Sequence, residues 1–192
     1  MQQPPQQQPT WSGSDGTIET LFGEKAPFVF VPTLKATSLG NGWGTMLGVY
    51  GGAQISKNIL IGLGTYSTFS HPSVNMGYTG LMVEYRYTPY RLLHIGGSLL
   101  AGYGAASRSF NAGIRPFGII ENVGRLFTPQ FFVLEPSVFG EVNLNTNLSA
   151  SLGASYRWAG GLSETLSSTQ TGLTNAALSG VAINLGMRFR ID

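Results

Sequence analysis

The sequence contains little charge and no cysteine. Only 10% of its 192 residues are Asp, Glu, Lys or Arg, whereas soluble domains carry about 25%. A water-facing enzyme of the usual kind is therefore not expected. Without cysteine, the chain forms neither disulfide bonds nor thiolate metal sites. A disordered chain is also excluded, because 11% aromatic residues and a mean hydropathy of +0.09 supply ample apolar surface to bury.

Long apolar runs and an excess of one charge sign are also missing. Residues 58–83 form the longest uncharged stretch, but Gly, Ser, Thr, Asn, His and Pro interrupt it, and a transmembrane helix needs about 20 consecutive apolar residues. The net charge is only +2, so nucleic acid is not an expected partner. The Gln/Pro run that follows Met1 has neither the basic nor the apolar region of a signal peptide, and none is expected in this chain.

What the sequence does contain is alternation. Residues 1–27 are rich first in Gln and Pro and then in Gly, Ser and Thr, which predicts a flexible leader. Residues 28–192 hold eight runs in which apolar residues alternate with small or polar ones, the period of a β-strand. These runs lie at about residues 28–37, 47–55, 59–69, 80–88, 93–106, 132–144, 148–158 and 181–192.

The charged residues follow the same alternation. Eight of the twenty fall inside the runs, all on the small or polar face: Lys35, Glu84, Arg86, Glu135, Glu141, Arg157, Arg188 and Arg190. A soluble barrel or sandwich would turn its charges outward, whereas this pattern places an uncharged apolar face outside. Runs of 9 to 14 residues suit a tilted bilayer span of about 9 to 11. Strands in lipid must close into a barrel to pair every backbone group, so we predict an all-β, eight-stranded antiparallel up-and-down transmembrane barrel.

The connections and the aromatic residues support this fold. Connections at residues 56–58, 88–91 and 145–147 are tight, whereas those at 70–77, 107–130 and 160–177 are longer, and the short link 39–43 belongs to the second set. Short periplasmic turns, longer extracellular loops and two periplasmic termini are the outer-membrane arrangement. Aromatic girdles are expected toward the loop side and the turn side, respectively at Trp43, Phe69, Tyr103 and Trp158 and at Phe28, Tyr85, Tyr87 and Phe189.

These runs and turns resemble the eight-stranded outer-membrane barrels of the outer membrane protein A and X type. Residues 77–87 (GYTGLMVEYRY) and 131–137 (FFVLEPS) look in particular like an uncharacterised group of outer-membrane barrels from Bacteroidota. The resemblance covers residues 28–192 and implies a Gram-negative outer-membrane location with lipids and lipopolysaccharide as surroundings. It implies no single activity, because this fold hosts anchors, adhesion and defence barrels and a few lipid-modifying enzymes. Members usually end in an aromatic residue, whereas this chain ends Phe189-Arg190-Ile191-Asp192.

The inward charges form the first candidate site. A lumen charge network would contain Glu84, Arg86, Glu135, Glu141, Arg157, Arg188 and Arg190. An eight-stranded barrel is just wide enough to be filled by its own side chains, which favours a structural plug over a path for protons or very small solutes. Catalysis is not expected, because His94 lies on the lumen face, His71 lies in a connection, and Ser67 on the apolar face has no evident base. No cofactor and no metal site are expected.

The connection at residues 107–130 forms the second candidate site. Its exposed apolar residues suggest a contact surface for a partner protein or for lipopolysaccharide, with a lid over the barrel mouth as the alternative; they include Phe110, Ile114, Phe117, Ile119, Ile120 and Phe127. The predicted function is therefore non-enzymatic: a structural, adhesion or docking role through the loops, alone or as an accessory subunit of an outer-membrane complex. A narrow pore is the first alternative, and a lipid-modifying enzyme that uses His94 or His71 is the second.

Overall fold

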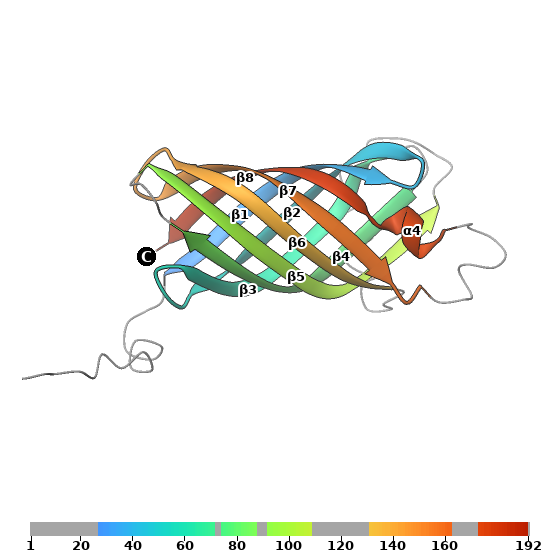
Figure 1. Cartoon of the computed structure of the whole chain (residues 1–192), viewed down its shortest axis with the longest axis horizontal. Coiled ribbons are helices and arrows are strands. Elements are labelled where there is room, and N and C mark those ends of the chain that lie inside the picture. Colours follow the sequence, from blue (N-terminus) through green and yellow to red (C-terminus); the bar gives the residue numbers. More distant parts are fainter. Residues whose placement is uncertain (1–26, 72–73, 88–91, 109–130, 163–172, 192) are drawn as a thin grey trace, which may run out of the picture.

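The computed structural model describes residues 27–71, 74–87, 92–108, 131–162 and 173–191. Within these ranges, eight antiparallel strands follow one another around a closed barrel, and one short helix, α4 (Asn175–Leu178), lies beside the end of β7 (Figure 1). The strands are β1 (Phe28–Leu39), β2 (Gly42–Gln54), β3 (Ile59–Ser70), β4 (Val74–Tyr87), β5 (Leu93–Arg108), β6 (Phe131–Asn143), β7 (Leu148–Gly160) and β8 (Gly180–Ile191). The predicted eight-stranded antiparallel barrel is confirmed.

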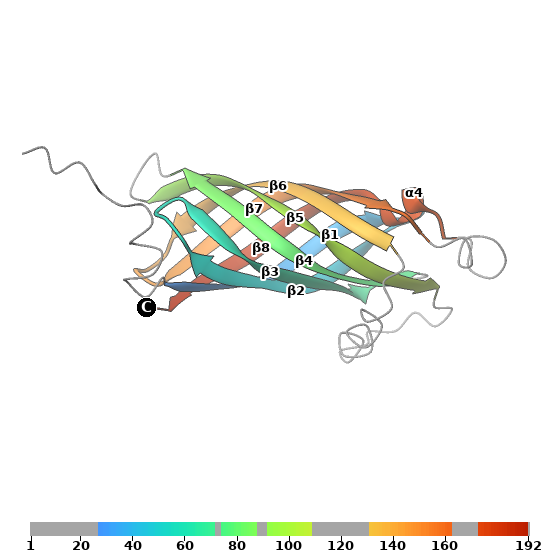
Figure 2. The same cartoon turned by 90° about the horizontal axis from the view of Figure 1, so that it is seen from below.

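The barrel closes between the first and last strands, where Phe28 lies opposite Ile191. Phe28, Ile191 and the connections after β2, β4 and β6 lie at one end, here called the turn end. The connections after β1, β3, β5 and β7, together with α4, lie at the other, here called the loop end (Figures 1 and 2). Strands of 12 to 16 residues are long enough to cross a bilayer when tilted.

Alternation separates a lipid-like outer surface from a charged interior. Outward side chains such as Leu63 and Val138 are 63% and 65% exposed. Every strand Lys, Arg, Asp or Glu whose side chain the structure describes is buried, apart from the half-buried Arg190. Closing the sheet pairs the strand edges, so an apolar exterior without free edges meets both demands of a bilayer. Within the described ranges, no helix is long and apolar enough to cross a membrane.

The predicted aromatic girdles follow the two rims. Trp43 and Tyr103 at the loop end are each 61% exposed, and Tyr85 and Tyr87 at the turn end are 54% and 58% exposed. Seven of the eight predicted girdle residues are exposed, and the eighth, Phe69, is half-buried. Aromatic rings with one polar edge are typical of the interface between hydrocarbon and headgroups.

Two connections differ from the sequence prediction. The predicted long connection at 70–77 is wrong, because β3 continues to Ser70 and β4 begins at Val74. The His71 ring shortens it: Nδ1 accepts from Val74 N at 3.0 Å, and Nε2 lies 3.1 Å from Leu39 O. The connection at 160–177, predicted only as one of the longer connections, contains the helical turn α4 capped by Thr174, whose Oγ1 accepts from Ala177 N at 3.1 Å.

Small residues allow the strands to approach closely inside the wall. A Cβ atom added to Gly102 on β5 would lie 1.9 Å from the carbonyl oxygen of Thr79 on β4. That oxygen belongs to the backbone and cannot move aside, so only glycine fits this position.

Candidate functional site

The half of the lumen nearer the turn end holds a chain of ion pairs, here called the turn-half cluster: Tyr50, Glu84, Arg86, Glu141 and Arg188. Glu141 accepts from Arg86 Nη1 at 3.0 Å and from Arg188 Nε at 2.8 Å. Arg188 also donates to Glu84, which accepts a further bond from the Tyr50 hydroxyl at 2.9 Å. These ion pairs and hydrogen bonds join β2, β4, β6 and β8 across the lumen. Arginine suits this arrangement, because its planar fork serves two carboxylates at once.

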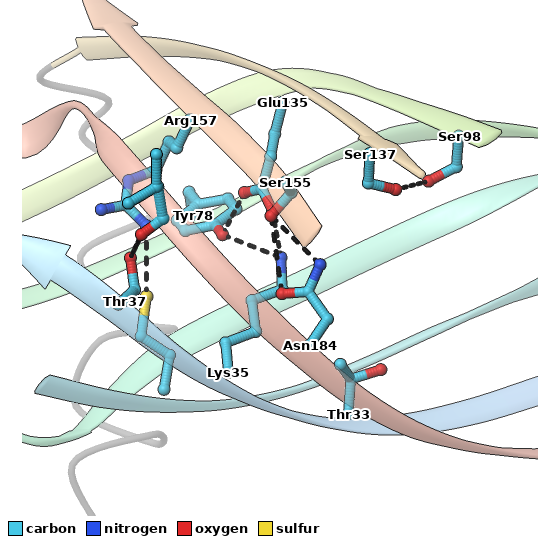
Figure 3. A network of polar contacts seen from close by, with 12 residues as sticks. Thr33, Lys35, Thr37, Tyr78, Ser98, Glu135, Ser137, Ser155, Arg157 and Asn184 are labelled. Atoms are coloured by element: carbon cyan, nitrogen blue, oxygen red, sulfur yellow. Dashed lines mark hydrogen bonds and ion pairs between the residues drawn. The ribbon is translucent and has the colours of Figure 1, made fainter. Parts of the chain in front are cut away.

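Among the described residues, the other half of the lumen holds a single ion pair, here called the loop-half pair: Lys35 on β1 and Glu135 on β6. Both side chains are buried. Tyr78 also donates to Glu135, and the Lys35 ammonium lies 3.4 Å from the centre of the Tyr66 ring. Figure 3 shows Lys35, Tyr78 and Ser155 converging on Glu135 from different strands. Tyr78 and Ser155 therefore complete the hydrogen bonds of the ion pair, and the face of the Tyr66 ring covers the ammonium group.

Arg157 is buried without a carboxylate. Its Nε donates to Leu178 O at 2.7 Å, Nη2 donates to Ser38 O at 3.2 Å, and Nη1 donates to Thr37 Oγ1 at 3.3 Å. Figure 3 places Arg157 beside Thr37, apart from the group around Glu135. Because the carbonyl of Leu178 ends α4, this arginine fastens the helical turn to the inside of the barrel wall.

An apolar cluster fills the lumen at the loop end. Leu178 of α4 is fully buried and Leu173 is 2% exposed, although both belong to the connection between β7 and β8. The Ala177 carbonyl also accepts a bond from Gly40 N at 2.7 Å, which joins α4 to the β1–β2 connection. This loop-end apolar cluster comprises Leu39, Met46, Tyr66, Val74, Met76, Tyr78, Met82, Leu100, Ala106, Phe131, Val133, Ala159, Leu173 and Leu178.

The space left in the middle of the lumen is small. A cavity of about 40 Å³ lies among Lys35, Tyr50, Ser98, Glu135 and Asn184. Because one water needs about 10 to 15 Å³ by this measure, the cavity has room for a few waters. It is bounded by the turn-half cluster on one side and by the loop-end apolar cluster on the other. Side chains therefore fill the middle of the described lumen.

The seven residues of the predicted lumen charge network all lie inside the barrel but do not form one network. Glu84, Arg86, Glu141 and Arg188 join in the turn-half cluster. Glu135 pairs elsewhere with Lys35, Arg157 binds backbone carbonyls, and Arg190 makes no ion pair with the described residues. The predicted contact residues Phe110, Ile114, Phe117, Ile119, Ile120 and Phe127 lie outside the described residues.

Three residues of these clusters were absent from the predicted network. Lys35 has the inward phase of the other charges, but its strand has the weakest alternation. Tyr50 and Tyr78 complete carboxylate bonds that alternation alone does not reveal. An available signal was their inward phase, since a buried tyrosine hydroxyl normally finds a partner.

The two histidines hold structure together. Both ring nitrogens of His71 lie within hydrogen-bond distance of backbone atoms, as described above. His94 lies in the lumen, where Nε2 is 2.8 Å from Asn143 Nδ2. Among the described residues, no three His, Asp or Glu side chains are grouped to hold a metal ion.

Comparisons with known proteins agree on architecture. No protein-family model and no curated protein sequence matches the chain. The crystal structure of Neisserial surface protein A superimposes with a TM-score of 0.60 at 9% identity, covering 86% of this chain and 97% of that one. A barrel from the de novo design of transmembrane β-barrels gives 0.51 at 8% identity, covering 88% and 98%. At these identities the similarity shows the fold, which is that of the eight-stranded outer-membrane barrels.

Proposed function

We propose that the chain is an integral barrel of a Gram-negative outer membrane, with the turn end in the periplasm and the loop end outside. The uncharged outer surface and the aromatic rims support this placement. The two longest connections, residues 109–130 and 161–179, both lie at the loop end, which supports the orientation. A relationship with barrels of the outer membrane protein A and X type, including those of Bacteroidota, is part of this proposal and rests on the sequence resemblance.

Within that setting, the barrel acts as a non-enzymatic anchor that presents its loop-end segments for a structural, adhesion or docking role. The observation that carries this function is the closed lumen, in which Arg157 holds Leu178 of α4 inside the loop end. Because the lumen is closed at the loop end, the outer surface and the loop-end segments are the parts able to meet another molecule on that side of the membrane. Residues 109–130 are the longest of these segments and carry six aromatic or isoleucine side chains together with Arg115 and Arg125.

Deletion of residues 110–127 tests the docking role of this segment. The barrel itself is the internal control, because a folded outer-membrane barrel migrates differently on a gel before and after heating. We expect the deletion variant to keep this heat-modifiable migration and its outer-membrane fractionation, but to lose co-purifying envelope partners or cell-surface contact. Unchanged co-purification and unchanged surface behaviour in a folded variant would remove the docking role.

A path for protons is the second candidate, and one observation favours it. The 40 Å³ cavity lies between the two charge clusters and touches both Lys35 and Tyr50. A chain of a few waters there would link groups able to exchange protons. The test is dye-reported proton leakage from liposomes that contain the refolded barrel, and leakage that falls in Glu135→Ala would favour this candidate over the plug.

A further inference from the structure

A second, larger cavity lies at the mouth of the turn end. Its volume is about 370 Å³, and turn residues such as Lys57, Thr146 and Asn147 form its rim. The inward ends of Gln54 and Arg190 line it from β2 and β8. We call this cavity the vestibule. It is separate from the 40 Å³ cavity in the middle of the lumen, and it is wide enough for a small organic molecule rather than a few waters.

The vestibule is lined by cations without lining carboxylates. Lys57, Arg86, Arg188 and Arg190 all contribute to its surface, whereas no Asp or Glu among the described residues does so. Glu84 and Glu141 lie behind this lining and are bound to Arg86 and Arg188. Three lumen arginines therefore face two carboxylates, which leaves the mouth with a surplus of positive charge. A cleft of one charge sign between low-dielectric walls concentrates ligands of the opposite sign.

Two buried polar atoms identify the groups that a ligand would have to supply. Nε of Arg190 and Oε1 of Gln54 have no hydrogen-bond partner among the described residues. The amide orientation of Gln54 is fixed, because Nε2 donates to Lys57 O at 3.1 Å. Arg190 Nε can therefore donate to a ligand acceptor, and Gln54 Oε1 can accept from a ligand donor. Buried polar groups are normally paired, so a ligand with an anionic oxygen and a hydroxyl group would complete both.

We propose that the vestibule binds a small hydroxylated organic phosphate, with its phosphate group at Arg190 and a hydroxyl at Gln54 Oε1. Guanidinium groups bind phosphate oxygens through short, charge-assisted hydrogen bonds. A compact phosphate monoester enters the mouth as a free molecule, whereas a phospholipid headgroup would have to bend into the lumen from the surrounding bilayer. This binding site is independent of the docking role proposed for the loop end.

The experiment is a calorimetric titration of the full chain, refolded in a phosphate-free maltoside detergent, with glycerol 3-phosphate and with inorganic phosphate. We expect saturable binding of both probes and tighter binding of glycerol 3-phosphate. Arg190→Gln should weaken both probes about tenfold or more, which is the usual effect of losing a charge-assisted hydrogen bond. Gln54→Leu should remove only the advantage of glycerol 3-phosphate. Arg125→Gln, a matched charge removal in the segment between β5 and β6, should change neither.

Each variant is first checked for heat-modifiable migration, and folding is expected because Arg190 makes no ion pair within the described structure. Absence of binding to the wild-type chain, or equal binding by wild type and Arg190→Gln, would overturn the proposal. Binding that appears only in Asp192→Asn would also overturn it, in favour of an intramolecular pair with that carboxylate. A final titration in nanodiscs with phosphatidylglycerol separates the two phosphate sources: competition there would replace the free ligand with a lipid headgroup.

Discussion

The two halves of the lumen neutralise their charges in different ways. In the turn-half cluster Glu141 accepts from two arginines, and the cluster borders a cavity of about 370 Å³ whose rim includes turn residues. The loop-half pair is a single Lys–Glu contact enclosed by tyrosines beneath the loop-end apolar cluster. Both halves bury charge, but only the turn half leaves polar atoms facing a sizeable space. The barrel is therefore closed at the loop end and has a cavity large enough for a ligand at the turn end.

The largest expected effect on stability comes from removing the carboxylate at the centre of the turn-half cluster. Glu141→Gln leaves Arg86 without its carboxylate and removes one of the two carboxylates of Arg188, which should lower the free energy of unfolding by about 3 to 5 kcal/mol. Glu135→Gln is the matched variant in the loop half. It should cost less, because a buried lysine can release its proton whereas an arginine cannot. Denaturant unfolding in lipid vesicles measures both, and equal losses would erase the difference between the halves.

Loosening the seal at the loop end should have the next largest effect. Leu178→Ala removes a fully buried side chain and should cost about 2 to 3 kcal/mol, near the lower end for such truncations, because the short segment can partly collapse into the space. Hydrogen exchange should accelerate at the amides of Leu178 and Ser179, which the α4 turn protects. Amides near the turn-half cluster serve as the control. Uniform acceleration in both halves would show that α4 is not a local seal.

The third largest difference is expected in how fast a water-soluble reagent reaches each half of the lumen. Ser149 and Ser155 lie on β7 and are each 7% exposed, but Ser149 lines the vestibule and Ser155 binds Glu135. The chain has no native cysteine, so Ser149→Cys and Ser155→Cys can be labelled without background. We expect a small water-soluble thiol reagent to modify Ser149→Cys at least about ten times faster, because thiol reactivity follows access. Equal rates would mean that the loop half is as open as the vestibule.

The smallest expected effect is the joint replacement of the loop-half pair. Lys35→Met combined with Glu135→Leu should change the free energy of unfolding by only about 1 kcal/mol, because apolar side chains of similar size often replace a buried ion pair without loss. Each single substitution should cost more than the double one. A double-mutant cycle from the same unfolding curves measures this coupling. An additive cycle would show that Lys35 and Glu135 do not depend on each other.

The sequence predicted the wall of the barrel better than its filling. Because successive strand side chains face opposite sides, the alternation around Glu84 and Arg188 determined which faces turn inward. Which inward charges meet depends on the stagger between strands that are distant in sequence. Lys35 and Glu135, for example, are 100 residues apart. Strand alternation carries no information on that stagger, so one network was predicted where two clusters exist.

The seal at the loop end was not predicted for a different reason. Leu173 and Leu178 belong to a connection without periodicity, and their burial depends on Arg157 and Gly40 binding the carbonyls of α4. A partial signal was present in Met46, Met76 and Met82, which occupy inward positions that otherwise hold small or polar residues. Large apolar side chains at inward positions indicate a filled lumen rather than a water-filled one.

The closed lumen is the central claim, and ion conductance across a planar bilayer tests it most directly. The refolded wild-type barrel should give no discrete conductance steps in symmetric salt, because α4 and the loop-end apolar cluster block the path of ions. Detergent-matched bilayers without protein serve as the control. Reproducible steps in the wild type whose size changes in Arg157→Ala or Glu135→Ala would contradict the claim and establish a pore through the two charge clusters.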